Sequence, residues 1–357
     1  MLWSPSPGSG CWVLGSSRPL SLSTSVMSVR RLFVHKMHGT GNDFVVMDGR
    51  VSDVLELFQL DSSGISPLAA QLGHRRFGIG FDQLLLVDHP TDSQKADVFM
   101  RIFNSDGSVA EMCGNGVRCV SFFVRHLADK PLMSDTFRVE TLSRIVTVSL
   151  LSAPKTSIES TFSPSAPSSL VASVVSVRVD MGLPEILSNN VSVPSIMENT
   201  FVGYSISMGN PHFVIFLPDQ KDASVRLSSL DCFSVTTHGP VIENSTSIFP
   251  HKTNVEFVTA SSTQSEAVKM RVWERGAGET LSCGSGACAV GAASILRAIA
   301  LNKPIDNHTV DVHLPGGSLT IEWNPETSNT GQPLHPLYMS GPASLVGKIE
   351  IDVMAPS

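Results

Sequence analysis

The chain has 357 residues, 42% of them hydrophobic and 16% charged, a balance that excludes a fibrous or wholly disordered protein and allows two globular domains. The formal net charge of −7 argues against a nucleic-acid partner, because such proteins concentrate Lys and Arg. The apolar segment at residues 287–296 is shorter than the roughly 18 to 20 residues that span a bilayer. We therefore expect a small-molecule partner, with neither nucleic acid nor membrane.

The first 31 residues differ in composition from the rest of the chain. They are rich in Ser, they include Arg18, Arg30 and Arg31, and no acidic residue precedes Asp43. This pattern is typical of an organellar transit peptide, with a disordered extension of no targeting value as the alternative. We expect a soluble protein, in a plastid or other organelle if the leader is a transit peptide and in the cytoplasm otherwise.

Strands and helices can be predicted along the chain from its apolar runs. Two helices are expected at residues 117–128 and 287–300, and the second is apolar on nearly every face, as in a helix surrounded by protein. Strands are expected where β-branched residues cluster between Gly, Pro or Asn, namely at residues 98–103, 171–179, 213–217, 268–273 and 319–323. The strand content should therefore be high.

The chain contains an internal repeat. Residues 100–116 align without a gap with residues 270–286, at an offset of 170. Residues 37–46 resemble residues 207–215, and both stretches predict a Gly-Asn turn that leads into an apolar strand. The repeat predicts an α/β (α+β) fold of two homologous domains related by pseudo-twofold symmetry, each a curved, mostly antiparallel sheet around a central helix.

The expected domain limits follow from this repeat. An N-terminal domain should cover residues 32–165 and a C-terminal domain residues 166–340, with residues 341–357 returning to the first domain or forming a tail. Residues 151–170 are rich in Ser and Pro, so we expect an exposed loop near the boundary and assign it no chemistry.

The chemistry is expected at two Cys-Gly-x-Gly turns, which begin at Cys113 and Cys283. Glycines on both sides of one residue let the backbone bend sharply, and the following helix directs its positive end at the same place, which suits a carboxylate. A helix N-terminus also lowers a thiol pKa from about 8.5 toward neutrality. Two such cysteines on opposite sides of one carbon would invert it, one removing a proton and the other donating one.

Other interpretations of the cysteines remain open at this point. A single Cys beside Gly is often simple packing, but packing does not explain a recurrence at matched positions. Cys119 and Cys288 are expected to be core thiols. Zn is disfavoured because the spacings do not match a C-x2-4-C pattern, so no metal is expected. Six cysteines are too few for a disulfide scaffold, although a Cys113–Cys283 disulfide could form on oxidation.

Seven motifs stand in the order found in diaminopimelate epimerases, which the chain resembles from about residue 32 to residue 351. They are Met-His-Gly-Thr-Gly-Asn-Asp-Phe, Gly-Phe-Asp-Gln-Leu, Phe-Asn-Ser-Asp-Gly, Cys-Gly-Asn-Gly-Val-Arg-Cys, Met-Gly-Asn-Pro-His, Glu-Arg-Gly-Ala-Gly-Glu-Thr and Cys-Gly-Ser-Gly-Ala-Cys. Proline racemases share the fold and the cysteine pair, but usually have His and Thr where this chain has Asn115 and Ser285. The resemblance therefore favours the epimerase.

The resemblance implies inversion of 2,6-diaminoheptanedioate between its LL and meso forms on the route to lysine, with no cofactor. Cys113 and Cys283 would be the acid/base pair, supported by His212 and Glu274, while Arg275 would bind the distal carboxylate. The reacting carboxylate would be held by Gly114, Asn115, Gly284 and Ser285. The rest of the substrate would contact Asn42, Gln83, Asn104, Asn210 and Asn254.

The resemblance also implies a homodimer, with Tyr338 near the contact between subunits. Within the same fold, the alternative is a proline or hydroxyproline racemase, for which Arg275 would be unnecessary because those substrates lack a distal carboxylate. A non-catalytic protein that binds a diamino acid is the alternative from another class.

Overall fold

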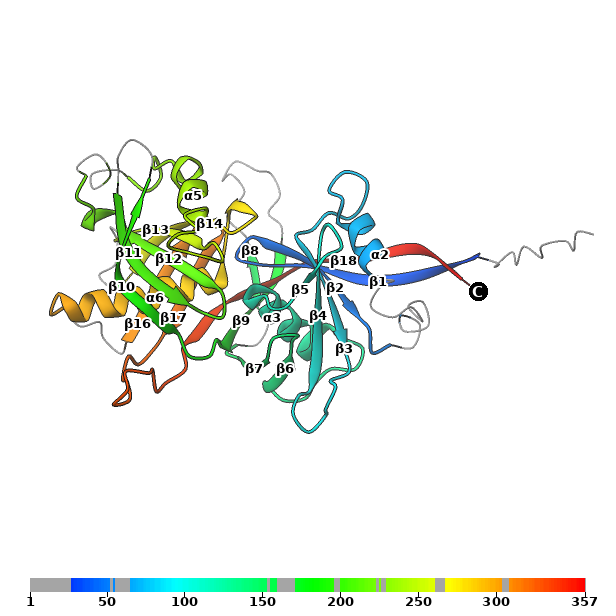
Figure 1. Cartoon of the computed structure of the whole chain (residues 1–357). Helices are drawn as coiled ribbons and strands as arrows, with labels where there is room; N and C mark the ends of the chain where they lie inside the picture. The colour runs from blue at the N-terminus through cyan, green and yellow to red at the C-terminus, as the bar shows by residue number, and fades with distance from the viewer. Residues whose placement is uncertain are drawn as a thin grey trace, which may run out of the picture.

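The structure is a computed structural model. It describes residues 27–51, 54, 65–152, 155–158, 171–195, 200–222, 225, 229–260, 267–303 and 308–356. The predicted leader up to residue 26, and residues 153–154 and 159–170 of the Ser/Pro-rich segment, lie outside the described residues. The fold is mixed α/β with mostly strands and few helices, arranged as two lobes side by side (Figure 1).

The first lobe is formed by the N-terminal half of the chain. Its strands are β1 (Met27–Gly39), β2 (Asn42–Asp48), β3 (Gln83–Asp88), β4 (Val98–Asn104), β5 (Val109–Ala110), β6 (Thr136–Glu140), β7 (Ile145–Leu150), β8 (Lys155–Ile158) and β9 (Val171–Asp180). Its helices are α2 (Ile65–Gly73) and α3 (Gly114–Phe122), and a π-helical turn, Phe123–Leu127, continues α3. Neighbouring strands pair antiparallel except β2 with β3 and β4 with β6.

The second lobe repeats this arrangement. Its strands are β10 (Glu185–Pro194), β11 (Thr200–Ser207), β12 (Pro211–Phe216), β13 (Asn254–Ala260), β14 (Ala267–Glu274), β15 (Gly278–Thr280), β16 (Thr309–Leu314), β17 (Gly317–Glu322) and β18 (Tyr338–Pro356). Its helices are a 3-10 turn (Leu217–Asp219), α5 (Val235–Glu243) and α6 (Gly284–Ala300). The parallel pairs are again the corresponding ones, β12 with β13 and β14 with β16.

The register of the strands recurs together with their order. Phe44 pairs with Gln83 in the first lobe, and His212 pairs with Asn254 in the second. β2 and its counterpart β12 each follow a glycine with positive φ, Gly41 at 84° and Gly209 at 95°. L side chains rarely adopt this conformation. Both predicted Gly-Asn turns are therefore present, and they bring equivalent side chains to equivalent places.

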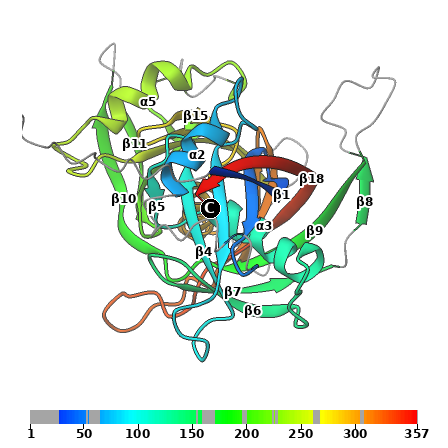
Figure 2. The same ribbon diagram turned by 90° about the vertical axis from the view of Figure 1, so that its right-hand side faces the viewer.

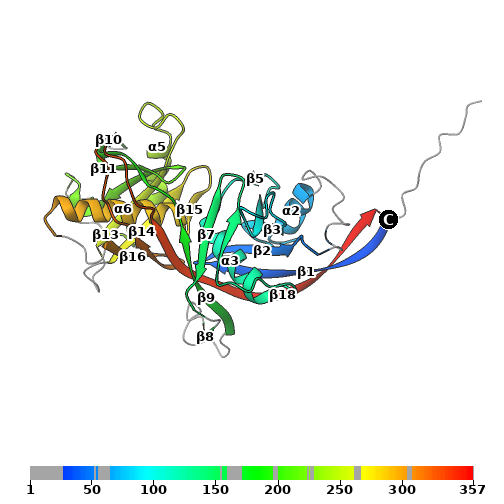
Figure 3. The ribbon, with the colours of Figure 1, turned by 90° about the horizontal axis from the view of Figure 1, so that it is seen from below.

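The last strand joins the two lobes. Residues 338–345 of β18 pair with β9, and the first of these residues pair also with β17. Residues 344–356 then pair with β1 in the first lobe. Figure 3 shows β18 passing from one lobe to the other, and Figure 2 shows its far half beside β1. The C-terminal residues are thus part of both sheets.

Each lobe has the helix that follows its cysteine in the interior. Every residue of α3 from Asn115 onward is buried, as is nearly all of α6 up to Ile295, which accounts for the apolar faces expected of the second helix. Cys119 and Cys288 are fully buried, which confirms that they are core thiols. None of the helices built from the described residues has the length and apolar character needed to cross a bilayer.

Two elements differ from what the sequence predicts. Regular α-helix after Cys113 begins at Gly114 and ends at Phe122, earlier than expected, and the rest is a π-helical turn. Within the predicted Ser/Pro-rich loop, Lys155–Ile158 is strand β8, which pairs antiparallel with β9. The strand forms in the short stretch between the Pro-containing segments, where the backbone can donate its amides to a neighbour.

Candidate active site

The two cysteines occupy the same position in both lobes, as the N-caps of α3 and α6. Each has an extended backbone, and each sulfur accepts a hydrogen bond of 3.4 Å from the amide of the glycine three residues later. This is the geometry of an N-cap, with a thiol in place of the usual hydroxyl or carboxylate oxygen. The Cys-Gly-x-Gly turns therefore place sulfur at the positive end of a helix, as the sequence predicts.

One cleft of 2640 Å³, with walls from both lobes, contains both cysteines. Typical small-molecule sites have about 300 to 1,000 Å³, so an amino acid would fill only part of it. The sequence-predicted residues that line the cleft are Asn42, Gln83, Asn104, Cys113, Gly114, Asn115, Asn210, Glu274, Arg275, Cys283, Gly284 and Ser285. His212 and Asn254 are predicted site residues that do not line it.

The N-termini of α3 and α6 meet at the bottom of this cleft. The Asn115 amide nitrogen lies 3.4 Å from the Ser282 hydroxyl, which is 2.6 Å from the Thr40 hydroxyl. A Cβ atom added to Gly284 would lie 3.2 Å from the Asn115 side-chain oxygen, so a larger residue would push the two helices apart. The first-turn amides of both helices, which have no acceptor within their own helix, are thereby brought to one place.

On the Cys113 side, the neighbours are amides. The Asn42 side-chain oxygen lies 3.7 Å from Cys113 Sγ and accepts a hydrogen bond from the Asn115 side chain at 3.3 Å. Gln83 donates to Asn104 at 2.9 Å across the β3–β4 pair. The side chains beside Cys113 Sγ are therefore neutral donors and acceptors.

On the Cys283 side, the neighbours include an ionisable group, the carboxyl group of Glu274. Cys283 Sγ lies 3.6 Å from the Ser285 hydroxyl, to which Asn210 donates at 3.3 Å. The Glu274 carboxylate accepts hydrogen bonds from Thr280 and from the Cys283 thiol. Burial raises the pKa of Glu274, although these bonds act in the opposite direction. The immediate neighbours of the two sulfurs thus differ, amides beside Cys113 and a carboxyl group near Cys283, although the backbones correspond.

His212 and Asn254 lie behind the cleft wall and position residues that face the cleft. His212 is fully buried and contacts Asn210 through Nε2 at 3.1 Å. Asn254 donates to the Pro211 carbonyl and accepts from the Arg275 backbone amide, both at 2.9 Å. The Arg275 guanidinium donates to the His251 carbonyl at 2.9 Å and faces the cleft. The Asn254 side chain is thus bonded to backbone on both sides and fixes the turn that presents Arg275.

The expected lowering of the thiol pKa is wrong for this structure. Burial raises the pKa of Cys113 to about 11, and the hydrogen bond from Gly116 opposes it only in part. Burial also raises the pKa of Cys283 well above its ordinary value, with Glu274 and Glu256 adding to the effect. Desolvation of the thiolate outweighs the helix N-terminus, so both residues are thiols at neutral pH.

Sequence analysis assigned no role to three residues that support the site. Glu256 is fully buried and accepts from His212 Nδ1 at 2.6 Å. Arg118, also fully buried, donates to the Asn115 side chain at 2.9 Å. Asp82 accepts from the Asn42 amide at 2.8 Å. Glu256 could have been noticed as a charged residue in an apolar strand, two positions after Asn254 and therefore on the same face.

Solved structures with this fold include isomerases. The chain is similar to a hydroxyproline epimerase from Agrobacterium vitis (TM-score 0.61, 13% identity, 91% of this chain and 92% of that chain). It is also similar to a phenazine biosynthesis protein of the PhzF family from Bacillus anthracis (TM-score 0.60, 14% identity, 90% and 99%). At these identities the likeness shows the fold alone. The chain therefore shares the fold of these structures, and its cleft holds two helix-capping thiols.

The particular family follows from the sequence comparisons. Residues 34–162 and 204–346 match the diaminopimelate epimerase family model. Diaminopimelate epimerases from Desulfitobacterium hafniense and Moorella thermoacetica are 40% and 38% identical over 326 and 320 residues. These alignments cover 88% and 86% of this chain and 95% of each relative. The chain belongs to the diaminopimelate epimerase family, whose members are isomerases of amino acids.

Proposed function

We infer that the protein is an isomerase that interconverts LL-2,6-diaminoheptanedioate and its meso form by inverting one α-carbon, a step of lysine biosynthesis. The supporting sequence similarity extends over most of the chain at about 40% identity. The structural observation on which the mechanism depends is that two cysteines cap two helices whose N-termini meet in one cleft. A carboxylate held by those helices would have one sulfur on each side of its α-carbon.

The proton transfers follow from the environments of the two thiols. Glu274 accepts a hydrogen bond from the Cys283 thiol, and burial raises the pKa of Glu274 toward that of a thiol. Transfer of the Cys283 proton to Glu274 therefore costs less than transfer to an ordinary carboxylate. The Cys283 thiolate then removes the α-proton, and Cys113 gives its thiol proton to the opposite face. In the other direction the two cysteines exchange roles.

The substrate would be held at both ends. The reacting carboxylate accepts hydrogen bonds from the first-turn amides of Gly114, Asn115, Gly284 and Ser285, where two helix dipoles also stabilise the developing negative charge. The forked guanidinium of Arg275 pairs with the distal carboxylate. The polar groups between them would be met by Asn42, Gln83, Asn104 and Asn210. His212 and Asn254 act from behind the wall, by orienting Asn210 and Arg275.

We propose a finer organisation for the fold as well. Two homologous domains, residues 32–165 and 166–340, are related by a pseudo-twofold axis. Strand β9 at the start of the second range pairs with β7 and β8 of the first lobe, and residues 341–357 return to the first domain. The recurring register and the pairing of β18 with β1 support this division. Closure of the domains over the substrate would exclude water and strengthen the hydrogen bonds to the carbanion. We also propose a homodimer with Tyr338 near its contact, and a transit-peptide function for the leader.

The mechanism is tested by removing each sulfur. Cys113→Ala and Cys283→Ala are each expected to end epimerisation of LL- and meso-diaminopimelate, while Cys232→Ala, which removes an exposed thiol, serves as the matched control. Near-normal turnover in either of the first two variants would contradict the two-base mechanism. In deuterium oxide, a single turnover should place label at one α-carbon only. Label at both ends within a single turnover would contradict the role of Arg275, and proton exchange on proline or hydroxyproline instead would indicate the alternative racemase.

A further inference from the structure

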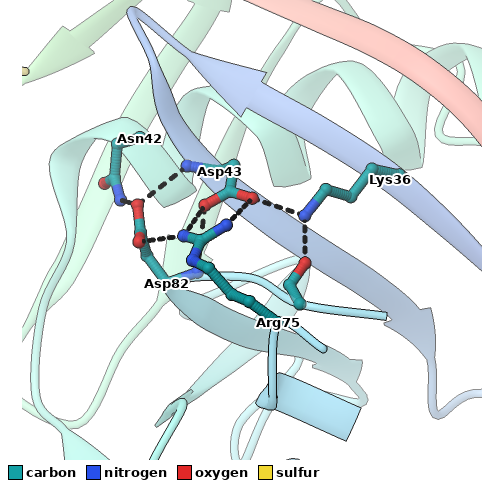
Figure 4. A network of polar contacts seen from close by, with 6 residues as sticks. Lys36, Asn42, Asp43, Arg75 and Asp82 are labelled. Atoms are coloured by element: carbon teal, nitrogen blue, oxygen red, sulfur yellow. Dashed lines mark hydrogen bonds and ion pairs between the residues drawn. The ribbon is translucent and has the colours of Figure 1, made fainter. Parts of the chain in front are cut away.

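The side chain of Asn42 has a fixed orientation beside Cys113. Its amide nitrogen donates to Asp82 Oδ2 at 2.8 Å, as Figure 4 shows. Because an ionised carboxylate can only accept hydrogen bonds, the nitrogen of this amide must face Asp82 and the oxygen must face away. That oxygen lies 3.7 Å from Cys113 Sγ, so the thiol meets an acceptor.

Asp82 is itself held on several sides. Its carboxylate accepts from Arg75 at 2.6 Å and from the Asp43 backbone amide at 3.1 Å, while its own amide donates to the Asp43 carbonyl at 3.0 Å. Asp43 in turn pairs with Arg75 and Lys36. Figure 4 shows the guanidinium of Arg75 between the two carboxylates. These bonds leave Asp82 little freedom, so they also fix Asn42.

The matching asparagine in the second lobe, Asn210, directs its amide nitrogen rather than its oxygen toward the cysteine side. The Asn210 amide nitrogen donates to the Ser285 hydroxyl at 3.3 Å, and its oxygen faces His212 Nε2 at 3.1 Å. Ser285, which thereby accepts, can donate its own proton to Cys283 Sγ at 3.6 Å. Two asparagines at equivalent positions therefore place an acceptor beside Cys113 and, through Ser285, a donor beside Cys283.

We propose that Asp82 is a positioning residue for Cys113: by fixing the Asn42 amide with its oxygen toward the thiol, it keeps the proton on Cys113, which is thereby poised as the proton donor. A hydrogen-bond acceptor stabilises the thiol form, whereas an amide N–H in the same place would stabilise the thiolate. The inference rests on the proposed function to the extent that Cys113 is taken as one of the two acid/base residues.

The other groups that act on Cys113 are independent of Asp82. Burial is the largest influence on the Cys113 pKa, and Glu274 on β14 raises it further. The Gly116 amide and Arg118, both on α3, lower it. None of these groups is bonded to Asp82 in the hydrogen bonds of the described residues. Removal of the Asp82 carboxylate should therefore change Cys113 through Asn42.

The test is the rate at which each cysteine reacts with iodoacetamide near pH 8, measured by peptide mass spectrometry on the full chain. In Asp82→Ala the Asn42 amide can turn its nitrogen toward Cys113, so alkylation of Cys113 should accelerate about tenfold for each unit by which its pKa falls. Cys283 should react at the wild-type rate. Asp82→Asn keeps a carbonyl oxygen for the Asn42 amide and should restore slow labelling of Cys113.

Two controls separate this role from loss of charge and from unfolding. Glu111→Gln removes a carboxylate that lines the cleft two residues from Cys113, and it should leave the labelling rates unchanged. Cys119 and Cys288 are fully buried and should stay unlabelled in any folded variant. If Cys119 or Cys288 is labelled in the Asp82→Ala protein, that variant is not folded, and Asp82→Thr is used in its place. Threonine is chosen because the chain itself has Thr253 at the matching position before β13.

The outcomes are distinct. Unchanged labelling of Cys113 in folded Asp82→Ala or Asp82→Thr, equal acceleration at Cys283, or failure of Asp82→Asn to restore slow labelling would each overturn the role of Asp82. Labelling needs no substrate, so these results do not depend on the epimerase assay. An active Cys113→Ala variant would instead refute the two-base mechanism and leave the labelling result standing.

Discussion

Gly116 and Gly286 occupy the same place in the two lobes, and a methyl group added to each would meet different surroundings. A Cβ at position 286 would lie 2.8 Å from Glu256 Oε1 and 3.3 Å from Cys283 Sγ. At position 116 it would lie 3.2 and 3.3 Å from the two methyl carbons of Leu85 and 3.5 Å from the Cys113 Cβ. The pair therefore tests whether the His212–Glu256 contact matters.

The magnitudes differ because the two neighbours differ in freedom. The Leu85 methyl groups can shift by a few tenths of an ångström, and the better helix propensity of Ala offsets part of the cost. Gly116→Ala should therefore change the unfolding free energy by less than about 1 kcal/mol. Glu256 is bonded to His212 where both are fully buried, and weakening such a charged hydrogen bond costs about 1.5 to 3 kcal/mol. Net destabilisation of Gly286→Ala should be about 0.5 to 2 kcal/mol after the propensity gain of about 1 kcal/mol.

The assay is urea unfolding of both variants together with epimerase kinetics. Displacement of Glu256 also moves His212 and with it Asn210, so Gly286→Ala should lower kcat at least about tenfold, equivalent to roughly 1.4 kcal/mol in the transition state. Gly116→Ala should remain within about threefold of wild type, under 1 kcal/mol on the same scale. Equal losses of stability and activity in the two variants would refute a special role for the buried pair.

Two further changes test residues that support the site. Arg118→Met replaces a buried charge by an apolar side chain of similar length, so the unfolding free energy should change by less than about 1 kcal/mol while epimerase activity falls as Asn115 loses its donor; a large loss of stability with unchanged activity would contradict this. For Asp43, burial would raise the carboxyl pKa, but hydrogen bonds from Arg75 and Lys36 lower it to about 2. A lowered pKa stabilises the fold above the unfolded value near 3.8, and this stabilisation is lost as the pH falls from about 4 through 2. Asp43→Asn should therefore cost about 2 kcal/mol at pH 6 and progressively less below pH 4 in urea titrations, and a cost independent of pH would contradict the assignment.

The features that the sequence predicts correctly are local or repeated. The Cys-Gly-x-Gly turns indicate helix N-caps because cap geometry depends on a few adjacent residues, and Cys113 and Cys283 are both N-caps. The repeat indicates matched strands because equal spacing gives equal register, as the pairs Phe44–Gln83 and His212–Asn254 show. Apolar runs also predict the strands around them well.

The features that sequence analysis missed depend on distant parts of the chain. The thiol pKa values are set by burial between two lobes, which the local motif of Cys113 does not contain. Arg118 lies within a Cys-Gly-Asn-Gly-Val-Arg-Cys motif, but its position between Asn115 and Pro342 depends on contacts with a distant part of the chain. Asp82 acts on Asn42 from 40 residues away, across a parallel strand pair. Such contacts require the fold before they can be identified.

The shared strand β18 has a consequence for synthesis of the chain. Met27–Lys36 of β1 pair with residues 347–356, which are synthesised more than three hundred residues later. Until they emerge, one edge of the first strand has no final partner, and contacts across more than three hundred residues are slow to form. A nascent chain would thus expose an unpaired strand edge until residues 347–356 emerge, and deletion of those residues should leave β1 prone to aggregation.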